Sequence, residues 1–424
     1  MQKLPVNAIY AQSGGVTSVI NASACGVIET ARRYSDRIGT VYAAHNGILG
    51  VLNEDLIDTQ YETEATISAL RQTPGGAFGS SRYVLHSQQH DPAAYTRLID
   101  VFKAHNIGYF FYNGGNGSAD TCEKIAAISH DMGYPIQAIH IPKTIDNDII
   151  GTDCCPGFGS VAKYVATATR ETGHDIASMA SSSTKVFILE VMGRNAGWIA
   201  AASALAQQNE EQPPHIILFP EVAFNLEKFI ASVNLVVARH GFCCVVASEG
   251  VCDENGRFLS ASDSADEAGD HQLGGVGPKL AKLVIAHTGL KTHYAVADYL
   301  QRAARHMASA TDVAQAYQVG VHAVEAALNG VNGAMVNIVR DSDEPYRWHC
   351  ETIGLEGIAT LERKLPANFI SEDGIHITAE ARRYLQPLII GEDFGVYDNR
   401  GLPAYAELKG ITATKKLPIW TANK

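Results

Sequence analysis

Positive charge is scarce in this chain. Its 424 residues include 33 Lys and Arg against 45 Asp and Glu, so the formal net charge at pH 7 is −12. An acidic surface repels polyanions, which argues against a nucleic-acid-binding protein and against a polybasic protein of the membrane surface. No apolar run reaches the roughly 18 residues of a transmembrane helix, and no charged-then-apolar leader precedes the first predicted strand. We therefore expect a soluble protein with no nucleic-acid partner and no membrane partner.

Cysteine pairs of the kind that bind metals or exchange disulfides are also absent. The 8 cysteines form no Cys-x-x-Cys pair, and several lie in apolar runs, where a free thiol behaves as a small hydrophobic group. Cys154 and Cys155 are adjacent, but a redox pair is the less favoured interpretation. Scattered free thiols are typical of a reducing compartment, so we expect a cytoplasmic location.

What is present is a regular alternation of strand and helix patterns. Short apolar runs such as residues 8–11, 107–112 and 185–191 predict strands, and a longer pattern with helical spacing covers residues 158–179. The alternation continues to about residue 340 and weakens after it. This pattern predicts an α/β fold with two doubly wound parallel sheets. Residues 341–424 are expected to form a C-terminal extension that packs on the core.

Glycine-rich turns follow several of the predicted strands. Such a turn directs backbone N–H groups outward and lets a phosphate approach closely. A single turn is equally well explained as a βα connection that needs positive φ, and the glycine- and serine-rich loop before Arg82 as a surface loop. Taken together they predict one polyphosphate site, with candidate residues Gly14, Gly15, Arg82, Gly115, Gly117 and Ser118.

Residues 142–148 carry the densest group of reactive side chains. Asp146 and Asp148 lie beside Lys143 and Thr144, directly after the apolar run 135–141. In an open α/β sheet, ligands bind at the carboxyl ends of strands, so this turn predicts an acid–base and charge-stabilising site. The alternative is a turn whose polar side chains only cap the following helix.

Seven motifs in order make the chain similar to the 6-phosphofructokinase family. The resemblance covers about residues 7–330, and although each motif alone is modest evidence, the ordered set is highly specific. The motifs are Ser13-Gly14-Gly15, Gly79-Ser80-Ser81-Arg82, Gly114-Gly115-Asn116-Gly117-Ser118, Thr144-Ile145-Asp146-Asn147-Asp148, Met192-Gly193-Arg194, Glu249 and Tyr299-Leu300-Gln301-Arg302. The resemblance implies two similar α/β domains with the active site in the cleft between them. It also implies a phosphotransferase that acts on the 1-hydroxyl of fructose 6-phosphate.

The resemblance also implies domain boundaries. Residues 1–155 with about 295–318 would form the phosphoryl-donor domain, which carries the candidate phosphate-binding residues. Residues 156–294 with about 319–340 would form the sugar-phosphate domain.

Roles for individual residues follow from the family pattern. Asp146 would take the proton of the sugar hydroxyl, Asp148 and Thr144 would assist it, and Lys143 and Arg194 would stabilise the transferred phosphoryl group. The implied substrate-binding residues are Thr144, Ile145, Asp146, Lys185, Met192, Gly193, Arg194, Glu249, His293, Tyr299 and Arg302. Lys185 and His293 stand where the family usually has arginines, the first of which reaches the 6-phosphate from a neighbouring subunit. A homodimer or homotetramer is therefore expected.

The expected cofactor is Mg²⁺, with Asn116, Asp146 and Asp148 as candidate ligands. The family usually has aspartate at the position of Asn116. A neutral asparagine oxygen attracts the cation less, so the metal would depend more on the donor's oxygens and on the two carboxylates.

Two positions indicate different phosphoryl donors. Lys143 stands where pyrophosphate enzymes of the family have lysine and ATP enzymes usually have glycine, whereas Gly117 is the residue typical of ATP enzymes. We give Lys143 more weight because its charge would act directly on the transition state, and we expect a reversible pyrophosphate-dependent reaction. The alternatives are an ATP-dependent 6-phosphofructokinase and a non-catalytic regulatory subunit or sugar-phosphate sensor. Sedoheptulose 7-phosphate stays open as a further substrate.

Overall fold

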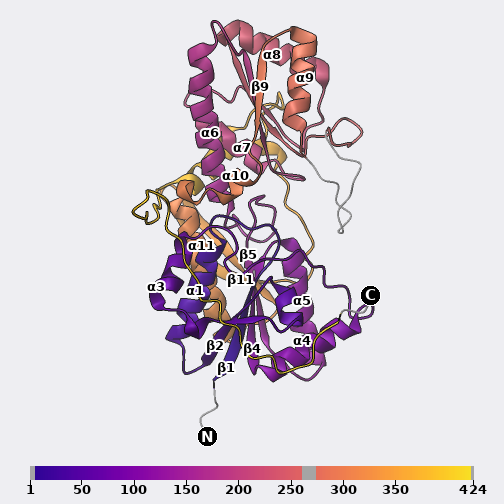
Figure 1. The fold of residues 1–424 in the computed structure, drawn as a ribbon. Coiled ribbons are helices and arrows are strands. Elements are labelled where there is room, and N and C mark those ends of the chain that lie inside the picture. Colours follow the sequence, from indigo (N-terminus) through magenta and orange to yellow (C-terminus); the bar gives the residue numbers. More distant parts are fainter. Residues whose placement is uncertain (1–4, 260–273, 422–424) are drawn as a thin grey trace.

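Two sheets organise the chain, and each lies in its own lobe (Figure 1). The computed structural model describes residues 5–259 and 274–421. The larger sheet has the strand order β11-β10-β5-β4-β1-β2-β3, and the smaller sheet has the order β7-β8-β6-β9. Within the described ranges, no helix is long and apolar enough to cross a membrane.

The strands are short, as the apolar runs predict. Their bounds are β1 Val6–Gln12, β2 Ile38–Ala44, β3 Leu56–Asp58, β4 Ile107–Gly114, β5 Gln137–Pro142, β6 Val186–Val191, β7 Ile216–Leu218, β8 Cys243–Ser248, β9 Thr292–Val296, β10 Ala334–Asp343 and β11 Tyr346–Gly354.

The α-helices connect these strands and cover the faces of the sheets. Their bounds are α1 Ile20–Arg33, α2 Ile48–Leu52, α3 Glu64–Ala69, α4 Pro92–Ala104, α5 Asn116–Asp131, α6 Phe158–Met179, α7 Trp198–Ala202, α8 Leu226–His240, α9 Val276–Thr288, α10 Asp298–Ala303, α11 Ala310–Leu328 and α12 Ala379–Leu385.

The larger sheet is parallel in its centre and antiparallel at both edges. β10, β5, β4, β1 and β2 run parallel, while β3 pairs antiparallel with β2 and β11 with β10. The central strands are apolar along nearly their whole length because helices bury both faces of the sheet. The antiparallel β11 follows from the short connection at residues 344–345, since a parallel strand would need a crossover of a dozen or more residues.

The smaller sheet is entirely parallel. Every residue of β8 is buried, and β6 is buried except at one position. Residues 293–296 of the edge strand β9 are exposed. β9 therefore leaves one side of the small lobe uncovered.

The structure differs from the predicted domain boundary in one segment. Residues 319–340 were expected in the sugar-phosphate domain, but β10 pairs with β5 in the larger sheet. The preceding helix α11 packs against α1, where a Cβ at Gly26 would meet the Tyr317 carbonyl oxygen at 2.3 Å and a Cβ at Gly320 would meet the Ser23 carbonyl oxygen at 2.2 Å. Because α11 packs this closely on α1, β10 follows it into the larger sheet and not into the smaller one.

The C-terminal extension contacts both lobes. β11 begins the extension and completes the larger sheet, a strand that the weak sequence pattern did not predict. Farther along, Phe369 and Leu385 join the main hydrophobic core, which includes residues of both lobes. The last described part runs along the large lobe, where Thr412 bridges to Ile57 and Trp420 packs on a second core.

Candidate active site

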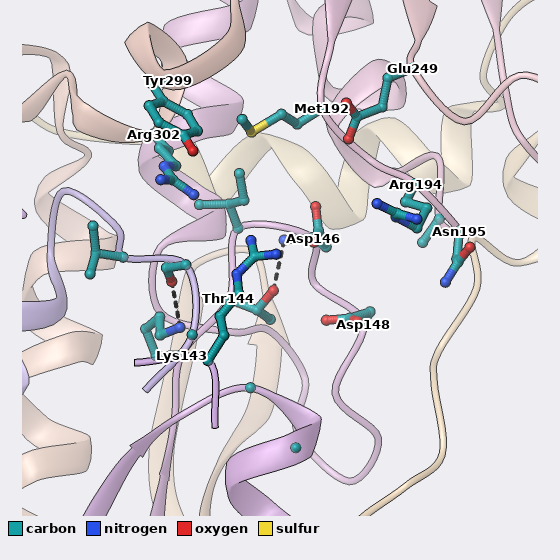
Figure 2. Close-up of a pocket in the computed structure, with 18 of the residues that line it drawn as sticks. Lys143, Thr144, Asp146, Asp148, Met192, Arg194, Asn195, Glu249, Tyr299 and Arg302 are labelled. Atoms are coloured by element: carbon teal, nitrogen blue, oxygen red, sulfur yellow. Dashed lines mark hydrogen bonds between the residues drawn. The ribbon is translucent and has the colours of Figure 1, made fainter. Parts of the chain in front are cut away.

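A cavity of about 980 Å³ lies between the two lobes, where strands from both sheets end. In the large lobe, the turns after β1, β4 and β5 contribute Gly14, Gly115 and Lys143. In the small lobe, the turns after β6 and β8 contribute Arg194 and Glu249 (Figure 2). Ligands are expected at the carboxyl ends of parallel strands, and here two such sets of strand ends face one cavity.

Most of the predicted residues line this cavity. They are Gly14, Gly15, Arg82, Gly115, Gly117, Ser118, Lys143, Thr144, Ile145, Asp146, Asp148, Met192, Arg194, Glu249, Tyr299 and Arg302. Gly193 and Asn116 adjoin lining residues without being among them. Lys185 lies at the opposite end of β6 and donates to the carbonyl of Ala180, and His293 is exposed on β9. These two side chains are outside the cavity of their own chain, and their expected contact with a neighbouring subunit stays a prediction.

Cations converge on the glycine turn that follows β1. The Lys143 ammonium is buried and donates to the carbonyl oxygen of Gly15 at 2.5 Å. A Cβ at Gly15 would lie 2.9 Å from Nη1 of Arg302 and 3.9 Å from Nη2 of Arg82. Gly14 has a φ of +73°, the left-handed region that favours glycine. The turn thus presents its backbone beside three positive side chains, an arrangement suited to a polyphosphate.

Arg302 is close to the turn after β1, although the family pattern assigns it to the sugar phosphate. Its guanidinium carbon lies 3.9 Å from the ring centroid of Tyr299, a cation–π contact that holds the side chain over the cavity. Figure 2 shows both residues on the side of the cavity near Lys143, away from Arg194 and Asp148.

Helix α5 directs its N-terminus at the cavity. Gly115 is its N-cap, and the Ser118 hydroxyl donates to the Gly115 carbonyl at 2.6 Å. A Cβ at Gly117 would meet nothing within 4 Å, so this position opens on empty space. Behind the turn, the buried His140 has its Nε2 3.0 Å from the Gly114 carbonyl oxygen. The N–H groups and the positive end of a helix dipole favour an anion here.

The turn after β5 holds the two aspartates in a constrained backbone. Asn147, between them, is buried and has a φ of +55°. The N–H of Asp146 donates to the Thr144 hydroxyl at 3.0 Å. The side-chain amide of Asn116 donates to the Asp148 carboxylate at 3.2 Å, so Asn116 orients a carboxylate in this structure.

Burial shifts the protonation of the central groups. Burial raises the pKa of Asp146, and the carboxylates of Asp148 and Glu249 add to the shift, while Lys143 opposes it. Burial lowers the pKa of Lys143 to about 8, against the attraction of the two aspartates. A carboxylate whose pKa is raised toward neutrality is a stronger proton acceptor than an ordinary surface aspartate.

The small lobe supplies the opposite wall. Glu249 accepts a hydrogen bond from the Gly193 N–H at 3.4 Å, and burial raises the pKa of its carboxyl group. The N–H of Met192 donates to the side-chain oxygen of Gln301 at 3.3 Å, which links this wall to α10. Polar groups that face the cavity from Glu249 and Arg194 can bind hydroxyls and phosphate.

The sequence interpretation missed several residues of this wall, among them Asn195 and Glu362. Asn195 and Glu362 line the cavity, and the amide of Asn195 donates to the Glu362 carboxylate at 3.0 Å. Asn195 directly follows the Met192-Gly193-Arg194 motif, so its place in the sequence could have indicated that it lines the cavity. Glu362 lies in an irregular part of the extension and carries no such signal.

Comparison with known proteins agrees with the geometry. The family profile described as phosphofructokinase matches residues 7–327. A pyrophosphate–fructose 6-phosphate 1-phosphotransferase of Methylococcus capsulatus is 58% identical over 97% of this chain and 98% of its own length. A protein of the same name from Halomonas elongata is also 58% identical, over 97% of this chain and 98% of its own. The crystal structure of a pyrophosphate-dependent phosphofructokinase from Marinobacter aquaeolei superposes with a TM-score of 0.90 and 56% identity, covering 98% of this chain and 99% of that one. This chain belongs to the phosphofructokinase family.

Proposed function

We propose that this protein is a phosphotransferase that moves a phosphoryl group between pyrophosphate and the 1-hydroxyl of fructose 6-phosphate, in both directions. The observation that carries the proposal is the buried ammonium of Lys143, which lies 2.5 Å from the carbonyl oxygen of Gly15 and three residues before Asp146. Two relatives at 58% identity bear the name of this activity, which supports it.

Asp146 is the proposed general base. It would accept the proton of the 1-hydroxyl as the sugar oxygen attacks the donor, and its raised pKa suits that step. Lys143 and Arg194 would neutralise the charge of the transferred group, since phosphoryl transfer depends mainly on positioning and electrostatic stabilisation. Glu249 and Met192 would hold the sugar against the wall of the small lobe.

Mg²⁺ is the proposed cofactor, with Asp148 and Asp146 as its protein ligands. No group of three or more His, Cys, Asp or Glu residues that could hold a metal occurs in the described part of the chain. Magnesium usually binds one or two carboxylates together with substrate phosphates and water, so this donor set fits a metal that arrives with the pyrophosphate. When bound, the ion would neutralise phosphate charge. Asn116 would act by orienting Asp148 through its amide.

A coupled assay with each donor tests the proposal. We expect turnover with pyrophosphate to exceed turnover with ATP, and Lys143→Gly to reduce pyrophosphate use by roughly 10²-fold or more, since one preorganised charge contributes on that scale. Lys103→Ala, at an exposed position of α4, is the matched control. The alternative, an ATP-dependent 6-phosphofructokinase, is favoured by Gly117 alone. Efficient ATP use by the wild-type protein would establish it in place of our proposal.

An Asp146→Ala variant separates catalysis from the third possibility, a sugar-phosphate sensor. We expect it to lose activity while still binding fructose 6-phosphate in calorimetry. Parallel assays with sedoheptulose 7-phosphate would define the sugar range.

A homo-oligomer in the cytoplasm is the proposed state. Beside the active site, four apolar side chains of β9 and α10 are exposed, Tyr294 by 50%, Val296 by 41%, Tyr299 by 61% and Leu300 by 67%. Exposed apolar clusters of this kind mark protein interfaces. His293 lies on the same exposed strand, where its side chain could reach a neighbouring subunit.

The cytoplasmic location rests on the free cysteines, which support a reducing compartment. Burial raises the pKa of Cys155, which makes its thiol unreactive.

A further inference from the structure

The C-terminal extension returns to the active site at residues 361–365, which we call the crossing segment. These residues lie outside the matched family region, 7–327. Glu362 forms an antiparallel bridge with Ile149, and the backbone N–H of Arg363 donates to the carbonyl of Asp148 at 2.7 Å. The crossing segment therefore packs directly on the turn that carries Asp146.

The Arg363 side chain fastens this turn through backbone carbonyls. Its Nε and Nη2 donate to the Asn147 carbonyl at 3.1 and 2.9 Å, and its Nη1 donates to the carbonyls of Thr152 and Asp153 at 2.9 and 2.8 Å. Hydrogen bonds from a charged guanidinium are roughly twice as strong as neutral ones, and its planar fork fixes their directions.

Asn147 needs such support because its backbone has a positive φ of 55°. A non-glycine residue keeps this conformation only where its surroundings hold it. Its side chain accepts the Cys155 N–H at 2.9 Å and donates to the Tyr384 hydroxyl at 3.1 Å. Tyr384 lies on α12, so the extension supports the turn at a second point.

The same segment is fastened to the small lobe. The Arg363 guanidinium carbon lies 4.9 Å from the ring centroid of Trp198, whose indole N–H donates to the Arg363 carbonyl at 3.3 Å. The Leu365 N–H and the Gly197 N–H donate to the same oxygen of Glu221, at 3.0 and 2.9 Å. Gly197 and Trp198 follow the motif that carries Arg194.

We propose that Arg363 is a positioning residue, which joins the catalytic turn of Asp146 to the loop of Arg194 across the cleft. Arg363 does not line the cavity, so it acts through the groups that it holds. The general base and the cation that stabilises the phosphoryl group come from different lobes, and an error of about 1 Å in their spacing costs on the order of 10²-fold in rate. The inference rests on the proposed function, since it assigns these roles to Asp146 and Arg194.

The test compares Arg363→Ala and Arg363→Lys with wild type in the full-length protein. We expect Arg363→Ala to lower kcat on the order of 10²-fold with KM changed much less, because the substrates keep their direct contacts. Arg363→Lys keeps the charge without the fork and should show a smaller but clear loss. Arg400→Ala is the control, because Arg400 is an exposed arginine of the extension that pairs locally with Asp398.

Guanidinium rescue separates positioning from general destabilisation. We expect guanidinium ion, well below denaturing concentrations, to restore part of the kcat of Arg363→Ala by entering the space that the side chain left. If Arg363→Ala were only less stable, guanidinium would act as a denaturant and lower its activity further. A further loss of activity would therefore overturn the proposal.

Two further outcomes would contradict the inference. One is a kcat of either variant within about threefold of wild type. The other is amide hydrogen exchange in Arg363→Ala that becomes faster at residues 147–153 but does not change at residues 193–198. That result would mean that Arg363 does not join the turn of Asp146 to the loop of Arg194. Each variant is compared with wild type on the donor that the wild-type protein uses, so this test does not depend on which donor that is. Wild-type turnover with pyrophosphate tests the proposed function separately.

Discussion

At the scale of single residues, Lys143 interacts electrostatically with both acidic and basic groups of the candidate active site. It is almost fully buried, yet it donates to a backbone carbonyl and faces two aspartates. A buried ammonium without partners would lose its proton, whereas this one keeps a pKa near 8 because Asp146 and Asp148 favour its charge. The residue that indicates the donor is thus also a titratable group.

The first prediction concerns this proton. Because burial lowers the pKa of Lys143 to about 8, its ammonium is present at neutral pH and is lost as the pH rises through that value. We expect kcat/KM for pyrophosphate to fall above about pH 8 for this reason. In Lys143→Arg the side chain stays charged, so the fall should move to higher pH. Equal profiles for the two proteins would assign the fall to another group.

The second prediction concerns Gly117, the residue that indicates ATP. Its surroundings are open, so Gly117→Asp should fold without strain, and a carboxylate in the first turn of α5 is favourable for the helix. We expect the ratio of pyrophosphate to ATP turnover to rise, because the new charge and bulk would oppose a larger donor. Gly117→Ala, which adds little bulk and no charge, is the control. An unchanged ratio would show that this position does not select the donor.

At the scale of elements, the extension was the part that the sequence described least. Its strand β11 was not predicted, and residues 361–365 and 404–417 contain no helix or strand, although their backbone bonds to the core. Arg363 donates a hydrogen bond to the carbonyl of Asn147, a residue 216 positions away in the sequence. No local periodicity encodes such a contact, so the predicted active site lacked Glu362 and the support from Arg363.

The third prediction concerns the anchoring of the last segment. The buried Glu54 carboxylate accepts the N–H groups of Lys416 at 2.5 Å and Leu417 at 3.1 Å, and it lies 2.6 Å from Nε2 of His105. Glu54→Ala would leave these donors without an acceptor, and we expect a loss of about 3–5 kcal/mol in the free energy of unfolding. Denaturant titration measures it, and Glu64→Ala on the exposed side of α3 is the control.

The same carboxylate gives the anchoring a pH dependence. Burial alone would raise the pKa of Glu54, but the hydrogen bonds from Lys416, His105 and Leu417 hold it below its ordinary value. A depressed pKa means that the stabilisation is complete above the unfolded-state pKa and is lost as the pH falls through the folded-state pKa. The stability difference between wild type and Glu54→Ala should therefore shrink in acid. A constant difference would contradict this account.

At the scale of the whole molecule, the uncovered side of the small lobe matters most. β9 is an edge strand, and its exposed apolar side chains adjoin Tyr299 and Arg302 in the cavity. An open edge with apolar side chains is a site for association.

The fourth prediction is that this side is the subunit interface. Leu300→Glu would place a charge in the apolar patch, and we expect it to shift the protein toward monomer in light scattering and to raise KM for fructose 6-phosphate. KM should rise because, in the proposed oligomer, Lys185 and His293 of one subunit contact the substrate bound to the neighbouring subunit. Leu235→Glu, on the exposed face of α8, is the control for a charge on an apolar surface position. A wild-type monomer in solution would contradict the prediction.

The sequence by itself determined the α/β class, the order of motifs and most of the residues in the cleft. It could do so because strands, glycine turns and reactive residues are local patterns, and because parallel strands bring their carboxyl ends together. The family membership that these motifs predicted was confirmed. Only the tertiary structure decided the antiparallel edges, the return of β10 to the larger sheet and the burial of Lys143. It alone showed that the extension contacts the turn at residues 146–148, because contacts between distant parts of the chain depend on packing and leave no periodic trace in the sequence.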